Sequence, residues 1–341
     1  MSNPIFIARQ DTLEQEILPA QWLSQYKLFG EESYTFQDKE IWKKLCMSSA
    51  AANDRDMHAE ALEEMLTTFS AEHTGKWMLL VYGMDAAVLE GLATMAAVAG
   101  NGTAMAAVAA NALLMHAITN SETAMDAIGT SRIARDAVQA SPYYNSYIKE
   151  NDMAIAKLVV ALASLESAGY SGMAGVAADS TAMAAVAASS TAMNAVVASS
   201  TAMTAVAASS TAMNAVVASS TAMTAVAASA TAMGKIAAVD AALSKLAAST
   251  TAMDALYARK KQMKDGGASK SGKFIILEIS QSNTFNTSKY GYATLSDGSK
   301  PDWSSYLAKY AFFQKYPKYA TYMLNDTDSD DYIYYFDIAS P

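Results

Sequence analysis

The chain has 341 residues, of which 52% are hydrophobic, a formal net charge of −9 at pH 7 and a single cysteine, Cys46. The acidic balance argues against nucleic-acid binding, which depends on basic residues, and it provides no attraction to an anionic membrane surface. One cysteine excludes an intramolecular disulfide framework, so we expect packing alone to stabilise the fold and Cys46 to be a small buried residue.

Residues 1–82 have the composition of an α-rich globular region. They contain Trp22, Trp42 and Trp77, mixed charges, and helical patterns such as that of residues 54–73. We therefore predict an N-terminal docking region here. The start of the chain lacks a basic segment followed by an apolar one, so we expect no secretory signal.

The same region contains histidines and glutamates that invite a metal-site interpretation. They lie between residues 58 and 73 and do not form an HExxH pattern. Their separations put the side chains on different faces of a helix. We expect a solvated acidic helix face instead, and no cofactor.

A ten-residue phrase then repeats through residues 83–260. The stretch "STAMNAVVASSTAMTAVAAS" at residues 190–209 recurs unchanged at residues 210–229. In each copy a Met is followed three residues later by a Val, which is a helical spacing. We expect these side chains to form the core of the repeats: Met183, Val186, Met193, Val196, Met203, Val206, Met213, Val216, Met223 and Val226.

A ten-residue period does not suit one straight helix, because ten residues fall roughly 80° short of three full turns. The phrase Ser-Ser-Thr stands between successive Met-Val pairs, and Ser and Thr favour helix N-caps over helix interiors. The repeat therefore predicts an α-solenoid of short capped helices, in which each unit folds back on its predecessor and two units form a duplicated module. An oligomeric rod of long helices remains the alternative.

The repeats carry no charged residue between Asp179 and Lys235. Ser, Thr or Asn recurs every few residues, so no apolar run is long enough for a membrane span. A lone exposed rod normally carries mixed charges. The neutral surface therefore favours packing against another copy or another protein.

After the repeats we expect a linker at residues 261–272 and a small α+β domain at residues 273–341. Residues 273–280, 290–295 and 331–338 are rich in Ile, Tyr and Phe and are typical of strands. Residues 303–316 have the pattern of an amphipathic helix that Pro317 would end.

Aromatic and acidic residues supply the candidate sites of this domain. Tyrosine offers contact area with a polar handle, so these residues are candidates for a binding surface, with core packing as the alternative: Tyr290, Tyr292, Trp303, Tyr306, Tyr332 and Tyr334. Asp326, Asp328 and Asp330 match the first positions of a calcium loop, but the required Gly is missing, and an acidic hairpin turn is favoured. No catalytic constellation stands out, so we expect no enzyme activity.

The phrase Ser-Ser-Thr-Ala-Met-x-Ala-Val-x-Ala resembles the repeat of tail-fibre and related virion proteins of tailed bacteriophages. The likeness is close over residues 180–236 and looser over residues 85–260. The resemblance implies a non-enzymatic virion component that is assembled in the host cytoplasm. Its N-terminal end would dock to other tail or baseplate proteins, and its C-terminal domain would contact a partner or a bacterial surface receptor. Such fibres are homo-oligomers, often trimers.

Two alternatives to a tail fibre stay open. The chain is short for a complete long fibre, which leaves a baseplate, collar or adaptor component without host contact. A carbohydrate-active tip is the second alternative, with the carboxylates of residues 326–331 as its first candidates.

Overall fold

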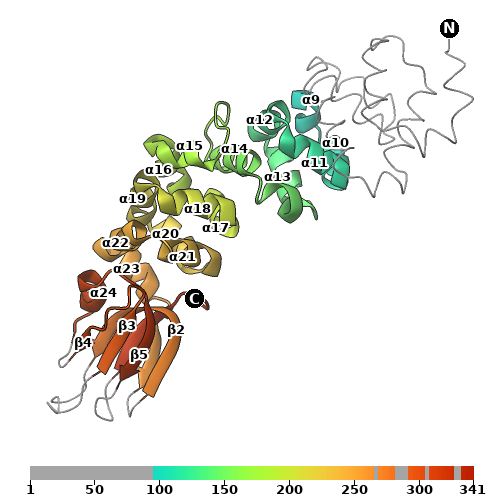
Figure 1. Cartoon of the computed structure of the whole chain (residues 1–341). Coiled ribbons are helices and arrows are strands. Elements are labelled where there is room, and N and C mark those ends of the chain that lie inside the picture. Colours follow the sequence, from blue (N-terminus) through green and yellow to red (C-terminus); the bar gives the residue numbers. More distant parts are fainter. Residues whose placement is uncertain (1–94, 265–267, 281–290, 304–306, 326–331) are drawn as a thin grey trace, which may run out of the picture. The chain divides into compact units, whose positions relative to one another are not determined.

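The computed structural model describes residues 95–264, 268–280, 291–303, 307–325 and 332–341. The expected docking region at residues 1–82 lies outside the described residues. The chain divides into two compact units, which we describe separately: residues 1–161 with 166–171, and residues 162–165 with 172–341. The described chain is mainly helical, with one antiparallel sheet in its C-terminal part (Figure 1).

The described part of the first unit is a run of short helices. They are α9 (Met95–Gly100), α10 (Gly102–Ala109), α11 (Ala112–Asn120), α12 (Glu122–Thr130), α13 (Arg132–Ala140), the π-helix η2 (Tyr144–Ile148) and α14 (Asp152–Leu162). Asn101, Ser121 and Ser131 each accept a hydrogen bond from the backbone N–H three residues later. The residue at the same position of the ten-residue repeat therefore caps each of these helices.

The second unit continues the pattern. Its helices are α15 (Met173–Ala178), α16 (Ser180–Ala188), α17 (Ser190–Ala198), α18 (Ser200–Ala208), α19 (Ser210–Ala218), α20 (Ser220–Ala227), α21 (Ala230–Ala237), α22 (Asp240–Ala248) and α23 (Thr250–Tyr257). α16 and α17 are bent by 101° relative to each other, as are α18 and α19. Long unbroken helices, the alternative that the sequence left open, are therefore not the arrangement of this segment.

A single residue makes the corner between most successive helices of the second unit, and it is usually a serine. Ser189 ends α16 and begins α17, with an extended backbone at φ −93° and ψ 114°. Its Oγ accepts a hydrogen bond from the N–H of Ala192 at 3.2 Å. The hydroxyl thus satisfies one of the N–H groups that a helix start leaves without a partner, so the next helix can begin at once.

Helices stack most extensively on the third helix before them. α19 contacts α16, α20 contacts α17, and α21 contacts α18. The corner serines reinforce this stacking, because Ser219 Oγ donates to the carbonyl of Ala187 at 2.5 Å. Ser209 and Ser249 make the same bond, each to a residue 32 positions earlier. One turn of the array therefore takes three units.

This stacking corrects two expectations. A unit does not fold back on its predecessor; it turns a corner and rests on the unit three before it. The identical twenty-residue copies are likewise not the packing module, because two units do not complete a turn. The twenty-residue duplication is a feature of the sequence and has no counterpart in the packing. Every unit presents nearly the same buried side chains to the unit on which it stacks.

The predicted Met and Val side chains line the inside of the array. All those named above between Met183 and Val226 are at most 1% exposed. The Ala before each Met is also buried, as is the residue after each Val, as Ala182 and Ala187 show. Positions one and four apart on a helix form one stripe, so most helices of the second unit bury four side chains along a single face.

The helices are interrupted between α14 and α15. Residues 163–172 form turns between α14 and α15 rather than a further repeat unit. Leu165 and Ala168, which keep the Met-Val spacing in the sequence, therefore lie outside any helix. The spacing alone does not identify a unit where the capping residue is missing.

The C-terminal domain is a six-stranded antiparallel sheet with one short helix. The strands are β1 (Lys261–Lys264), β2 (Ala268–Ser280), β3 (Gly291–Leu295), β4 (Asp302–Trp303), β5 (Ala320–Asn325) and β6 (Tyr332–Asp337), in the order β1-β6-β2-β5-β3-β4, and the helix is α24 (Ala311–Lys315). An isolated antiparallel β-bridge joins Leu307, which follows β4, to Ile279 on β2. The buried core of this domain includes Phe274, Trp303 and Phe312.

Two boundaries in this domain need correction. The expected linker at residues 261–272 is largely strand, because β1 pairs with β6 and the first part of β2 pairs with β5. The expected helix at residues 303–316 is reduced to α24. Its first residue, Trp303, pairs with Gly291 in β3 instead, and the positive φ of 73° at Tyr310 delays the helix start.

No single helix that the structure describes is long and apolar enough to cross a membrane by itself. Three bent pairs, among them α16 with α17, meet the criteria of length and composition together.

Replacing Met203 by Asp tests whether the inward stripe holds the array together. An unpaired carboxylate at this fully buried position should cost several kcal/mol and open the helices that stack on α18. Native-state hydrogen exchange measures this locally, as it does not require the long array to unfold in one step. Thr204→Asp is the control, because Thr204 is exposed. Equal protection in the two variants would mean that the stripe does not hold the helices.

Replacing Ser219 by Ala tests the corner. The change removes both the cap for Ala222 and the bond to Ala187. We expect a loss of about 1–3 kcal/mol in the local opening free energy of α20. Ser220→Ala, one residue later at an exposed position, should change it by less than about 0.5 kcal/mol. If the two substitutions had the same effect, the corner serine would have no special role.

Candidate functional site

Paired side chains attach the C-terminal domain to the last two repeat helices. Lys309 Nζ lies 3.2 Å from Asp254 Oδ1 on α23, and the Tyr310 hydroxyl donates to the same oxygen. Lys318 forms an ion pair with Asp240 at the start of α22. Helix α24 contacts α22, and α23 contacts β6, so both helices take part in the junction (Figure 1).

Tyr257, the last residue of α23, lies at the centre of this junction. Its hydroxyl donates to Glu278 Oε2 on β2 at 2.5 Å. Its ring meets that of Tyr310 edge to face, with centroids 5.8 Å apart. The ammonium groups of Lys260 and Lys309 lie 4.0 and 4.3 Å from the ring centroid, within the range of cation–π attraction.

Tyr310 adopts a left-handed backbone conformation that a non-glycine residue rarely takes. Its φ is 73°, and such a residue typically costs about 1–3 kcal/mol unless its surroundings hold it. Here its N–H donates to the carbonyl of Leu277 at 2.6 Å, and its ring is buried against Tyr257. The conformation brings the hydroxyl to Asp254, so the junction offsets the strain.

The pKa values of the tyrosines and of Asp254 at the junction shift in the directions that favour the protonation states needed for their hydrogen bonds. Burial, and then the hydrogen bond to Glu278, raises the pKa of Tyr257. Burial and the bond to Asp254 raise the pKa of Tyr310. The hydrogen bonds from Tyr310 and Lys309 lower the pKa of Asp254. At neutral pH the tyrosines are therefore neutral donors and Asp254 is an ionised acceptor.

Sequence reasoning missed this junction, although the repeat contains a signal for it. Asp254 occupies the position that Asn194 and Thr224 hold in earlier units. Tyr257 stands where those units have Val197 and Ala227. Polar or aromatic residues at repeat positions that are otherwise small or neutral indicate that the unit contacts something outside the array. Here α23 contacts the C-terminal domain.

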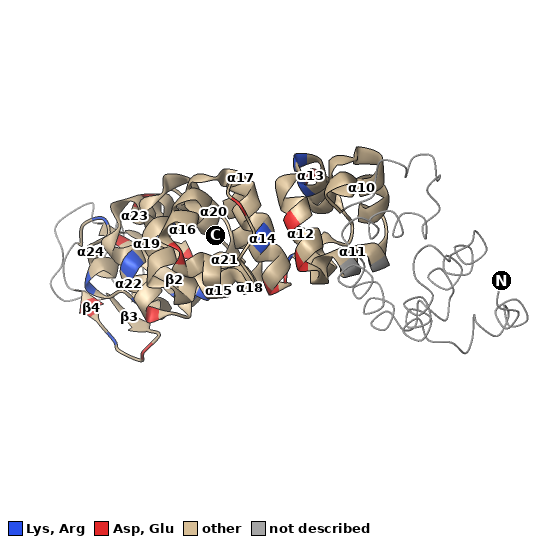
Figure 2. Ribbon diagram, turned by 90° about the horizontal axis from the view of Figure 1, so that it is seen from above, with Lys and Arg blue, Asp and Glu red and all other residues tan. Residues whose placement is uncertain are grey.

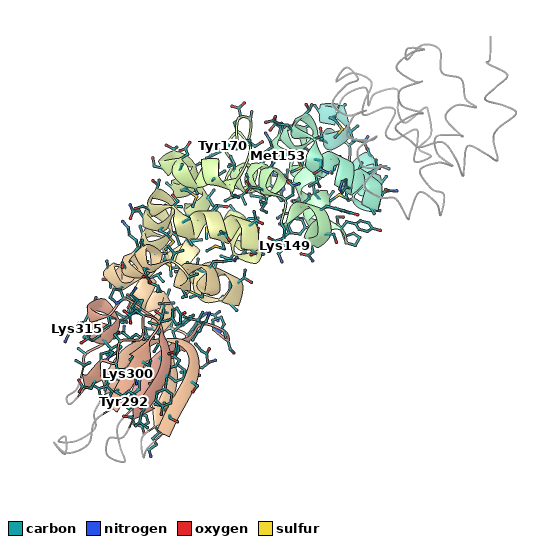
Figure 3. The ribbon with its side chains drawn as sticks, in the orientation of Figure 1. Lys149, Met153, Tyr170, Tyr292, Lys300 and Lys315 are labelled. Atoms are coloured by element: carbon teal, nitrogen blue, oxygen red, sulfur yellow. The ribbon has the colours of Figure 1, made fainter. Side chains whose placement is uncertain are left out.

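The candidate binding residues that the structure describes do not share one surface. Trp303 is 3% exposed and meets Phe312 edge to face in the core, so its predicted place on a binding surface is wrong. A Cβ at position 291 would come within 2.3 Å of its indole, which explains Gly291. Tyr292 lies on β3, labelled in Figure 3, and its ring packs near that of Tyr322.

Tyr332 and Tyr334 form a separate pair on β6. Their rings are stacked with centroids 6.4 Å apart, and Tyr334 also approaches Tyr257. The remaining candidates lie outside the described residues: Tyr290, Tyr306, Asp326, Asp328 and Asp330. Among the residues that the structure describes, no group of three or more His, Cys, Asp or Glu side chains could hold a metal ion.

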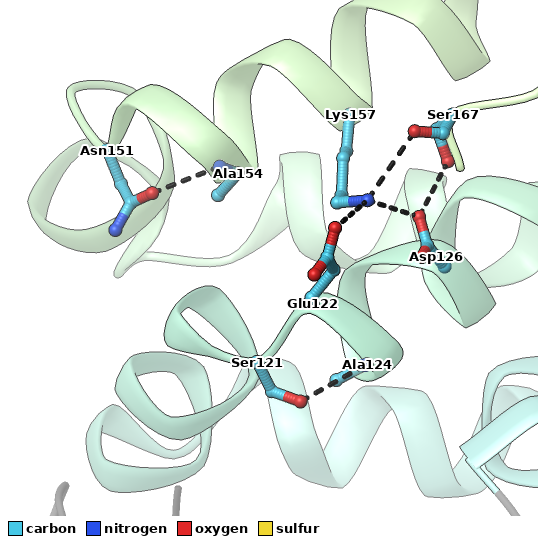
Figure 4. A network of polar contacts seen from close by, with 8 residues as sticks. All are labelled: Ser121, Glu122, Ala124, Asp126, Asn151, Ala154, Lys157 and Ser167. Atoms are coloured by element: carbon cyan, nitrogen blue, oxygen red, sulfur yellow. Dashed lines mark hydrogen bonds and ion pairs between the residues drawn. The ribbon is translucent and has the colours of Figure 1, made fainter. Parts of the chain in front are cut away.

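A buried lysine connects two segments of the first unit. Lys157 on α14 is fully buried, and its Nζ lies 2.6 Å from Asp126 Oδ1 and 3.3 Å from Glu122 Oε1 on α12 (Figure 4). Ser167, in the turn segment after α14, donates to the same oxygen of Asp126. A Cβ at position 129 would lie 2.5 Å from the Ser167 hydroxyl, so Gly129 allows this close contact. The network fixes the turn segment on α12.

No protein-family model matches this chain, and no curated protein matches its sequence.

Removing Asp126 tests the network. Asp126→Ala leaves the buried Lys157 ammonium with the Glu122 carboxylate and the Ser167 carbonyl, and breaking a buried pair from one side costs about 3 kcal/mol. Hydrogen exchange of α14 and of residues 166–171 should report this loss. Adding Lys157→Met should restore most of the protection, because no charge then stays buried.

Two further results bear on this prediction. Asp136→Ala breaks the exposed pair with Arg132 and should change protection by less than about 0.5 kcal/mol. If the double variant is as unstable as Asp126→Ala, the cost does not come from the buried charge.

Proposed function

We propose that the chain is a non-enzymatic structural protein of a phage virion, similar to a tail fibre. In this proposal residues 83–260 form an α-solenoid spacer between an N-terminal docking end and a C-terminal domain that binds a partner or a receptor. The resemblance of the repeat phrase to those of phage virion proteins gives the biological setting. The bonds from corner serines to carbonyls 32 residues earlier, in the second unit, carry the structural argument.

These hydrogen bonds suit a spacer because the same bond can form at each added unit, whatever the number of units. Each helix is too short to be stable alone and depends on neighbours one and three units away. Such an array can be lengthened unit by unit without a new core, as in other repeat proteins. Between Ser180 and Gly234 the side chains are Ala, Met, Val, Ser, Thr and Asn with one Gly, and no charged group is present.

The C-terminal domain has two roles in this proposal. It covers the end of the array through Asp240, Asp254 and Tyr257, which is the role of a capping element in repeat proteins. It also presents tyrosines such as Tyr292 and Tyr322 on the sheet, which suits contact with another molecule. Because the junction is held by several bonds, the domain keeps one orientation on the last helices.

A competition experiment tests the proposal. The purified chain is mixed with host cells and the parent phage, and adsorption is measured as the amount of chain increases. Lower adsorption and binding of the labelled chain to cells would support receptor contact. Binding to tails lacking this protein, without binding to cells, would support a baseplate, collar or adaptor role.

Two results would contradict the proposal. One is binding to neither virions nor cells. The other is steady loss of host surface polymer during incubation with the chain, which would make the C-terminal domain an enzyme. Tyr292→Ala with Lys300→Ala as the exposed control then shows whether the tyrosine face takes part in any binding (Figure 3).

A further inference from the structure

In the second unit, the corners after α16 are serines with one exception. Where α21 meets α22 the corner residue is Val239, and no side chain caps α22. The backbone at Val239 resembles that of a serine corner, with φ −123° and ψ 107° against −104° and 117° at Ser249. The backbone hydrogen bonds are also kept, because Val239 donates to the carbonyl of Ile236 and accepts from the N–H of Leu243. This corner therefore differs from the others by its missing hydroxyl.

The missing hydroxyl leaves the start of α22 without a side-chain bond to the earlier helices. Ser229 and Ser249, the corners on either side, donate to carbonyls 32 residues earlier, on α17 and α19. The side chain of Val239 has no polar group, so it cannot donate to α18 in the same way. Stacking on α19 is then the contact that holds the start of α22 on the array.

The polar side chains of α22 and α23 are bonded to the C-terminal domain instead. Asp240, the first residue of α22, pairs with Lys318. Tyr257, the last residue of α23, donates to Glu278. Charged side chains are absent from α16–α20, whose ribbons are tan in Figure 2, and they return in the last three helices of the array. α22 and α23 are therefore tied to the domain that follows them.

Three corners can be compared as places where the end of the array could open. Opening at Val239 interrupts the stacking of α22 on α19 and of α23 on α20, together with one serine bond, from Ser249 to α19. Opening one corner earlier would also break the stacking of α21 on α18 and the bond from Ser229 to α17. Opening one corner later would keep α22 on the array but break its pair with Lys318 and its contact with α24. Val239 is the corner at which α22 and α23 keep their bonds to the domain and no corner hydroxyl loses a partner.

We propose that the array opens at Val239, so that α22, α23 and the C-terminal domain leave α19–α21 together while the helices before them stay folded. Local opening suits a repeat array, because each unit contacts only its near neighbours. The C-terminal domain then has a second position, detached from the spacer, and reaches it without unfolding of the whole chain. The inference does not depend on a role in a virion.

Thiol labelling measures this opening in the full chain. Leu246 on α22 and Leu256 on α23 are fully buried, so a cysteine at either position reacts when these helices leave the array. Each cysteine is introduced singly together with Cys46→Ser. Leu246→Cys and Leu256→Cys should react at rates within about twofold of each other. Both should react at least about tenfold faster than Val196→Cys, a fully buried position on α17.

Val239→Ser supplies the missing hydroxyl. It should slow labelling at positions 246 and 256 about tenfold or more, because it adds a cap for α22 and a donor to α18. Labelling at position 196 should not change. Ala238→Ser is the matched control: it adds the same hydroxyl at the exposed neighbouring position and should change the rates by less than about twofold.

Three results would overturn the inference. Clearly different rates at positions 246 and 256 would mean that α22 and α23 do not leave together. Labelling at position 196 as fast as at position 246 would mean that opening is not confined to the end of the array. If Val239→Ser does not slow labelling, or if Ala238→Ser slows it equally, the array does not open at this corner.

Discussion

The array depends on one side chain that makes two hydrogen bonds. A corner serine accepts the N–H that begins its own helix and donates to the carbonyl at the end of a helix 32 residues earlier. The first bond ends one helix and starts the next, and the second bond fixes where that helix lies. Because a hydroxyl is both donor and acceptor, it can do both, whereas Asp at the same position can only accept. Asp179 accordingly caps α16 and makes no such donation.

The same constraint explains why the inward residues are so uniform. Three short helices per turn leave a narrow interior, and the helices of the second unit fill it with Ala, Met, Val, Leu and Ile side chains. Met is unbranched and adapts to small irregularities, and Ala lets the helices approach closely. The side chains that meet at successive stacking contacts are therefore similar, and the sequence can repeat without a specific partner for each residue.

Much of the array could be predicted from the sequence, and much of the junction could not. The Met-Val spacing and the Ser-Ser-Thr junctions predict short capped helices, because both features act within ten residues. The stacking on the third neighbour is not visible locally, since Ser209 gives no sign that its hydroxyl reaches Ala177. Trp303 was misplaced for the same reason: an aromatic residue in a small domain can be core or surface, and only the pairing of β3 with β4 decides.

The twenty-residue copies and the three-unit turn have different periods, and this difference affects the far end of the chain. Gain or loss of one whole copy leaves every serine bond possible, so the array would still fold. It would, however, move the last helix to another of the three sides of the turn. The carboxylates of Asp240 and Asp254 would move with it, and so would the sheet that they hold. The number of copies therefore sets the direction in which the C-terminal domain points relative to the first helices of the second unit, as well as its distance from them.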